Sequence, residues 1–177
     1  MITEKLVENY PQEFINRTEK ILEQYTTSVG PKLQSENKES EYYDVTLFIN
    51  CLYGLLMMPS KLYYDNLKEA SKNKTANEFL KENKLSKVIY FTTTPNKEIS
   101  LLEFIRSIRN GMAHWEDENK ILGFDYEPKE EGSTIKKIII TGSTKKDHGI
   151  FTKVTMDISS DDNRKKILAF LEWIYNK

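Results

Sequence analysis

The segment Phe104 to Glu116 brings together side chains that could act on a phosphodiester. It reads FIRSIRNGMAHWE and contains Arg109, Asn110 and His114. On a helix, Asn110 and His114 lie on one face, and the long stem of Arg109 lets it reach the same ligand. The histidine could accept or donate a proton near neutral pH, and the guanidinium could hold a phosphate through paired hydrogen bonds. These groups suit cleavage of RNA by attack of a 2′-hydroxyl, with no metal ion and no cofactor.

One histidine can act as the base or as the acid, but it cannot do both at once. Symmetric pairing of two chains would complete the set. Gly111 and Ala113 are small enough for a second backbone or an RNA strand to approach closely. Basic residues also belong at the C-terminal end of a helix, because they complement its dipole. The spacing alone therefore leaves open a structural reading in which Arg109 and His114 only close the helix.

Further basic residues could contact an RNA substrate. Arg106 precedes Arg109 by one helical turn, and we assign Arg106, Lys136 and Lys145 as candidate substrate-binding residues. Lysines on a β-strand also protect its edge from pairing with another chain, which explains Lys136 and Lys145 equally well. His148 lies in the polar stretch KKDHG. We interpret it as a solvated loop residue, with a second catalytic histidine as the alternative.

Most of the elements around this segment are predicted to be helical. Apolar residues at helical spacing predict helices over residues 12–26, 42–58, 61–68, 76–84 and 161–175. Gly30-Pro31 should end the first helix, and Thr75 should cap the fourth. The polar residues 33–41 should form a loop.

The helix that carries the candidate site has the clearest start signal in the chain. Ser100 and Glu103 form a capping box, in which each side chain satisfies a backbone N–H group near the other. Apolar residues then recur at helical spacing and should face the core as far as about His114. The preceding residues 88–94 could form a short strand or an extended connection.

After this helix the chain changes character. β-branched and aromatic runs over residues 121–126, 135–141 and 149–158 predict a β-hairpin or a small antiparallel sheet. We therefore predict a mainly α protein with a single domain over residues 1–177. It would have a helical core over about 11–115, the hairpin over about 121–158 and a C-terminal helix over about 160–175.

Length and composition fit one soluble, cytoplasmic domain. The chain has 177 residues, of which 38% are apolar and 30% charged. It has no apolar run that could cross a bilayer and no apolar leader typical of secretion. One cysteine provides neither a disulfide framework nor a cysteine-based metal site, which favours a reducing compartment. The net charge of −1 leaves two alternatives: RNA is bound at a small local site, or RNA is not the substrate.

The motif of Arg109-Asn110, three residues and His114 resembles the signature of the HEPN superfamily of ribonucleases and toxins. In that superfamily the residue after the arginine is typically polar, as Asn110 is. The chain is also similar to the HEPN family nucleases in its apolar segment VTLFINCLYGLLMMPSKLYYD, from Val45 to Asp65. The β-hairpin and terminal helix complete the resemblance, which covers about residues 14–175.

The resemblance implies a helical bundle that forms a homodimer, with the Arg/His motifs of two subunits facing a shared cleft. It implies that Arg109 binds and polarises the phosphate, that Asn110 orients the histidine or the phosphate, and that His114 is the acid and base. The products would carry 2′,3′-cyclic phosphates, with no metal needed. The setting would be a toxin–antitoxin pair or anti-phage defence, with an antitoxin or other regulatory partner.

Two points qualify what the resemblance implies. Toxins that a partner nucleotidyltransferase silences carry a tyrosine two residues after the histidine, where this chain has Glu116. The resemblance therefore does not extend that mode of silencing to this chain. The alternative function is a non-catalytic HEPN-type module for dimerisation or for binding a nucleotide or RNA.

Overall fold

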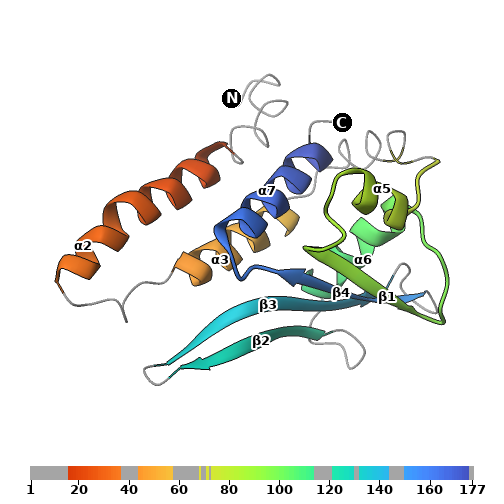
Figure 1. The fold of residues 1–177 in the computed structure, drawn as a ribbon. Coiled ribbons are helices and arrows are strands. Elements are labelled where there is room, and N and C mark those ends of the chain that lie inside the picture. Colours follow the sequence, from red (N-terminus) through yellow and green to blue (C-terminus); the bar gives the residue numbers. More distant parts are fainter. Residues whose placement is uncertain are drawn as a thin grey trace, which may run out of the picture.

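The computed structural model describes residues 16–36, 44–57, 68, 71, 73–113, 121–129, 132–143 and 150–175. Residues 16–24 are helical, and the remaining elements in chain order are η1 (Tyr25–Val29), α2 (Gly30–Ser35), α3 (Asp44–Met57), α5 (Ala76–Glu82), β1 (Ile89–Thr94), α6 (Leu101–Ala113), β2 (Ile121–Lys129), β3 (Gly132–Ser143), β4 (Phe151–Asp157) and α7 (Asp161–Tyr175). The helices lie on one side of a single sheet (Figure 1).

The sheet has four antiparallel strands in the order β1-β4-β3-β2. Its register places Phe91, Val154, Ile140 and Leu122 side by side across all four strands. Because side chains alternate between the two faces of a strand, this apolar row lies on one face. The ring of Phe91 is 4.9 Å from that of Phe104, so this face is the one that packs against α6.

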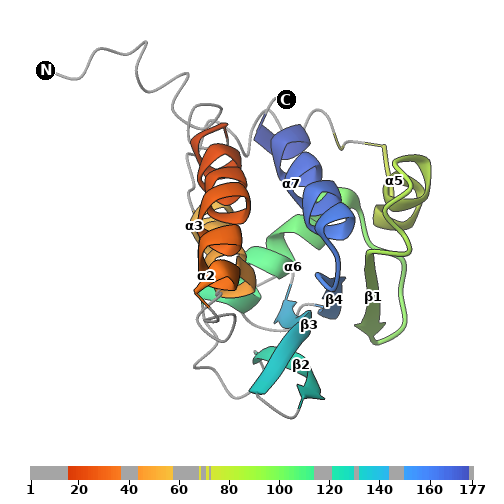
Figure 2. The ribbon, with the colours of Figure 1, turned by 60° about the vertical axis from the view of Figure 1, so that its left-hand side comes forward.

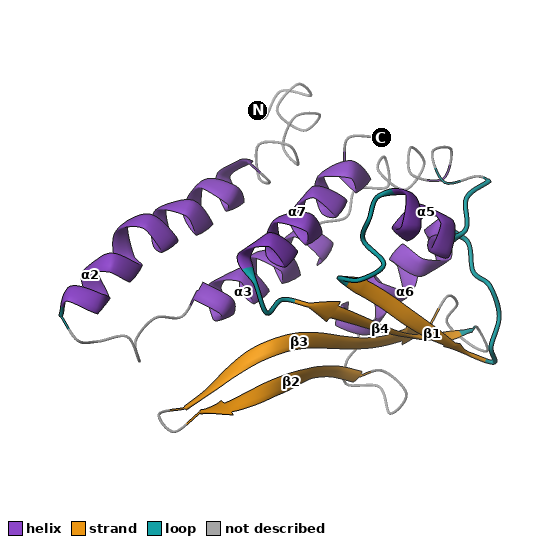
Figure 3. Ribbon diagram, viewed as in Figure 1, coloured by secondary structure: helices purple, strands orange, loops and turns teal. Residues whose placement is uncertain are grey.

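The prediction of a mainly α helical bundle is wrong, because the fold is a mixed α+β architecture (Figure 3). The sheet is not an appendage before the last helix. Residues Ile89–Thr94 join it as β1 and pair with β4, which would otherwise be an edge strand with unpaired backbone groups. Ile138, Ile140 and Val154 are completely buried, so the sheet supplies one side of the hydrophobic core.

The two helix starts predicted from capping signals are confirmed. At α5, the Thr75 hydroxyl accepts the backbone N–H of Glu78 at 3.2 Å, while the Glu78 carboxylate accepts the N–H of Thr75 at 3.0 Å. At α6, Ser100 and Glu103 form the same reciprocal pair, at 3.2 and 2.9 Å. Each box satisfies N–H groups that have no partner within the helix, which fixes where the helix begins.

The first helix continues past Gly30-Pro31, where it was predicted to end. Residues Tyr25–Val29 form a π-helical turn, and the N–H of Gly30 donates to the carbonyl of Tyr25, five residues back. Pro31 follows in the first turn of α2, and the helix ends at Ser35. A proline ring normally clashes with the carbonyl four residues earlier, and the wider π-turn relieves that clash. Residues 33–35, predicted as loop, are therefore helical.

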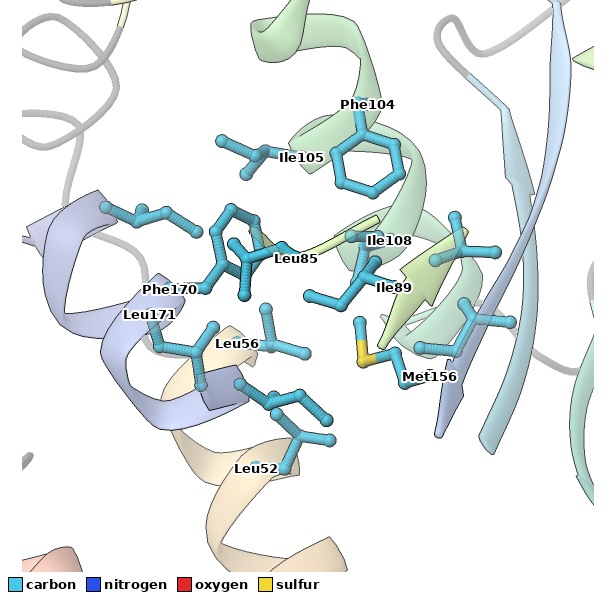
Figure 4. Close-up of a cluster of buried hydrophobic side chains, with 14 of the residues drawn as sticks. Leu52, Leu56, Leu85, Ile89, Phe104, Ile105, Ile108, Met156, Phe170 and Leu171 are labelled. Atoms are coloured by element: carbon cyan, nitrogen blue, oxygen red, sulfur yellow. The ribbon is translucent and has the colours of Figure 1, made fainter. Parts of the chain in front are cut away.

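The core lies between the helices and the sheet (Figure 4). Side chains from α3, α6, α7 and the sheet meet there, including Leu52, Ile108, Leu171 and Met156, all of which are completely buried or nearly so. Figure 2 shows α6 in the middle of the molecule, with β3 on one side and α3 on the other. The helix that carries the candidate site is thus held by both layers. No helix in the described part of the chain is long and apolar enough to cross a membrane.

Candidate functional site

Helix α6 approaches strand β3 so closely that the two backbones touch. A methyl group at Gly142 would overlap the carbonyl oxygen of Ser107 and lie 2.7 Å from the nitrogen of Gly111. A methyl group at Gly111 would lie 2.6 Å from Cγ2 of Ile140 and 2.7 Å from the carbonyl oxygen of Thr141. Only glycine fits at either position without a shift. The small size of Gly111 therefore allows the backbone of β3, within the same chain, to approach α6 closely.

The candidate residues lie on the side of α6 that faces away from the core. The core side consists of Leu101, Phe104, Ile105, Ile108 and Met112, all buried. Arg106 is exposed on the other side of the helix, and Arg109 and Asn110 are half-buried there. Residues three and four apart share a helix face, so Arg106 adjoins both of them. The sequence placed Arg106 one turn before Arg109, and the structure has the same spacing on α6.

Arg109 is held close to the body of the protein. Its side chain is half-buried and its Nε atom is completely buried. Partial burial lowers the local dielectric constant, which strengthens attraction to an anion such as a phosphate.

Asn110 is bound to the sheet. Its side-chain amide nitrogen donates to the backbone carbonyl of Ser143 at 2.9 Å. Ser143 is the last residue of β3 and is 4% exposed, whereas Asn110 is half-buried, so this hydrogen bond is partly shielded from water. The sequence alone could not predict that Ser143 accepts this hydrogen bond. The two residues are 33 positions apart, and every residue type has a backbone carbonyl. The one local signal is Gly142-Ser143, a small pair at the end of a β-branched run.

The structure does not bring Lys136 to this site. Lys136 lies seven residues before Ser143 on β3, which is roughly 20 Å at about 3.3 Å per residue. It forms an ion pair with Glu127 at 2.8 Å, and Lys137 pairs with Asp125 at 3.3 Å. The hydrogen bond to Asp125 raises the pKa of Lys137 above its ordinary value. The hairpin therefore carries less net positive charge than its lysines suggest.

Three of the predicted positions, His114, Lys145 and His148, lie outside the described residues. Their distances from Arg109 and Asn110 therefore stay predictions. The described part of α6 ends at Ala113, directly before the histidine. Lys145 follows Ser143 by two residues in the sequence.

A second feature was missed by sequence reasoning. A cavity of about 590 Å³ lies between the first helix, α3 and α7. Its apolar lining includes Leu22, Phe48 and Leu168, and its charged lining includes Glu19 and Arg164. Burial raises the pKa of Glu19, and the negative charge of Glu172 raises it further. None of the candidate residues of α6 lines this cavity.

A comparison with models of protein families gave one match. The model described as HEPN pEK499 p136 matches residues 1–177, which is the whole printed sequence. Neither the comparison with curated proteins nor the comparison with solved structures found a match.

Proposed function

The chain belongs to the HEPN pEK499 p136 family, and from this membership we propose that it is a metal-independent endoribonuclease. In the proposed reaction the ribose 2′-oxygen attacks the adjacent phosphorus atom and the bond to the 5′-oxygen breaks. The proton leaves the 2′-hydroxyl to a base, and an acid protonates the departing 5′-oxygen. The products carry a 2′,3′-cyclic phosphate and a 5′-hydroxyl, so no water or second substrate is consumed.

The observation that carries this proposal is the placement of Arg109. It lies next to Asn110 on the side of α6 away from the core, half-buried, in the last turns before His114. We assign it to bind the phosphate and to stabilise the charge that develops in the transition state. His114 is the acid and base. Arg106 and Lys145 contact the RNA beside the cleaved bond.

Two subunits are needed for the complete reaction. One His114 supplies either the base or the acid, so the proposal requires a homodimer in which two motifs share a cleft. Lys136 is too far along β3 to contact the same phosphate from the same subunit, and we assign it to RNA away from the cleaved bond. The proposed setting is the cytoplasm, in a toxin–antitoxin pair or in anti-phage defence, with an antitoxin or other regulatory partner.

A second candidate function is a non-catalytic HEPN-type module for dimerisation or for binding a nucleotide or RNA. The charge distribution favours a module for dimerisation or nucleotide binding over one that holds long RNA. The net charge is −1, and the hairpin lysines Lys136 and Lys137 are paired with carboxylates. Proteins that hold long RNA without sequence preference depend on a surplus of basic residues.

The test is cleavage of a labelled oligoribonucleotide in EDTA by purified protein. We expect the wild type to cleave, and Arg109→Ala and His114→Ala each to lower the rate by at least about 100-fold. Lys87→Ala, which removes an exposed positive charge just before β1, is the control and should cleave at the wild-type rate. Absence of cleavage by folded, dimeric wild type would favour the binding module.

A further inference from the structure

The last turns of α6 are held against the end of β3 by two kinds of contact. The first is the backbone approach at Gly142, which touches Ser107 and Gly111. The second is the hydrogen bond from Asn110 to Ser143, next along the strand. Both contacts fall within one turn of Arg109. The position of Arg109 is therefore set by the sheet as well as by its own helix.

The two contacts restrain the position of α6 on β3 in different ways. Glycine contacts bring the two backbones close, but they have no side chain that resists sliding or rotation of one element on the other. A hydrogen bond has a preferred length and direction, so it restricts this sliding and rotation. Because Ser143 is buried and the bond itself is partly buried, water would replace a lost Asn110 bond poorly. Asn110 thus sets how α6 is seated on the sheet.

We propose that Asn110 is a positioning residue, whose amide seats the Arg109 turn of α6 on the end of β3 in the absence of any ligand. This inference rests on the proposed ribonuclease function and refines it, because it removes Asn110 from direct contact with the RNA. One N–H of its side-chain amide donates to Ser143, which orients the amide group toward the end of β3. Misplacing a phosphate-binding group by about 1 Å can lower a rate by roughly 100-fold.

The first measurement needs no RNA and no activity. Hydrogen exchange of the amides of residues 109–113 is compared between wild type and Asn110→Ala. We expect exchange to become about tenfold faster in the variant, because the hydrogen bond that holds the last turn is lost. Unchanged exchange in these residues would overturn the proposal, whether or not the protein cleaves RNA.

The second measurement is the effect on cleavage. Asn110→Ala should lower kcat by roughly 10- to 100-fold and leave KM within about threefold. Asn110→Asp keeps the shape and an acceptor oxygen but turns a carboxylate toward the Ser143 carbonyl, so it should be at least as impaired as the alanine variant. Near-normal cleavage by Asn110→Asp would show that an acceptor oxygen acts on the RNA, against the proposal.

The chain contains a matched control. The amide nitrogen of Asn83 donates to the carbonyl of Phe79 at 2.9 Å, at the end of α5. Asn83→Ala removes the same kind of bond elsewhere and should leave both α6 exchange and cleavage unchanged. Faster α6 exchange in Asn110→Ala, together with inactive wild type, would support the positioning role and reject the ribonuclease.

Discussion

Two polar side chains near the contact between α6 and the sheet differ in whether they have a hydrogen-bond partner. The Asn110 amide is bonded to Ser143, whereas the hydroxyl of Thr152 is completely buried and has no hydrogen-bond partner among the described residues. Thr152 is opposite Gly142 on one neighbouring strand and opposite Thr93 on the other. A buried hydroxyl without a partner lowers stability, because it has left water and gained nothing in return.

Thr152→Val should therefore raise the free energy of unfolding by about 1 kcal/mol, since it keeps the shape of the side chain and removes the hydroxyl. Urea unfolding measures the change. The neighbour provides the control: Thr93 donates to the carbonyl of Lys97 and accepts its N–H, both at 2.8 Å. Thr93→Val should lower the free energy by about 1–2 kcal/mol. Destabilisation by both substitutions would mean that the Thr152 hydroxyl has a partner in solution.

At the scale of elements, the seating of α6 on β3 depends on the absence of a side chain at Gly142. Other strands of the sheet meet α6 through side chains, as Phe91 meets Phe104. At Gly142 the strand meets the helix backbone itself, at Ser107 and Gly111. The space there is already full, so any added atom must move the helix or the strand.

Gly142→Ala should lower the free energy of unfolding by about 1–3 kcal/mol and lower cleavage as well, because the methyl group overlaps the Ser107 carbonyl. Thermal unfolding and the oligoribonucleotide assay measure the two effects. Gly123→Ala is the control. Gly123 of β2 is opposite Ile139 of β3 and lies on the face of the sheet away from α6. Equal effects of the two substitutions would argue against the close backbone contact.

Local sequence signals predicted some elements well and others poorly. The capping boxes at Thr75 and Ser100 are complete within four residues, so the sequence alone located both helix starts. The pairing of β1 with β4 places Ile89 opposite Met156, far away in the sequence. No local sequence pattern predicts which strand will pair with β1. The helix through Pro31 was missed because a π-turn has no reliable sequence signature.

The same distinction applies to the candidate site. Arg106 lies one turn before both Arg109 and Asn110 on the helix, and that spacing was visible in the sequence. The separation of Lys136 from Asn110 was not visible, since it depends on where α6 crosses β3. The bond from Asn110 to Ser143 depends on the same crossing.

At the scale of the whole molecule, the proposed reaction makes a prediction about pairs of subunits. In the proposed shared cleft, one His114 acts as the base and the other as the acid, so a dimer of one wild-type subunit and one His114→Ala subunit lacks one of the two groups. Adding a large excess of His114→Ala protein to the wild type, with subunit exchange allowed, should therefore lower the cleavage rate, because wild-type subunits are drawn into mixed dimers. If each subunit cut alone, the added variant would leave the rate unchanged. Size-exclusion chromatography with light scattering should give the mass of two chains.

The β1–β4 pairing also has a consequence for the time at which the site first forms. Arg109 leaves the ribosome before the strands that seat it, because Ser143 and Phe151–Asp157 are synthesised later. Pairing between distant segments forms late, since the closing loop must first be complete. In a nascent chain, Arg109 would thus be synthesised before the strands that hold its helix in place. The turn that carries Arg109 would therefore reach its final position only after Ser143 and the strand Phe151–Asp157 had also been synthesised.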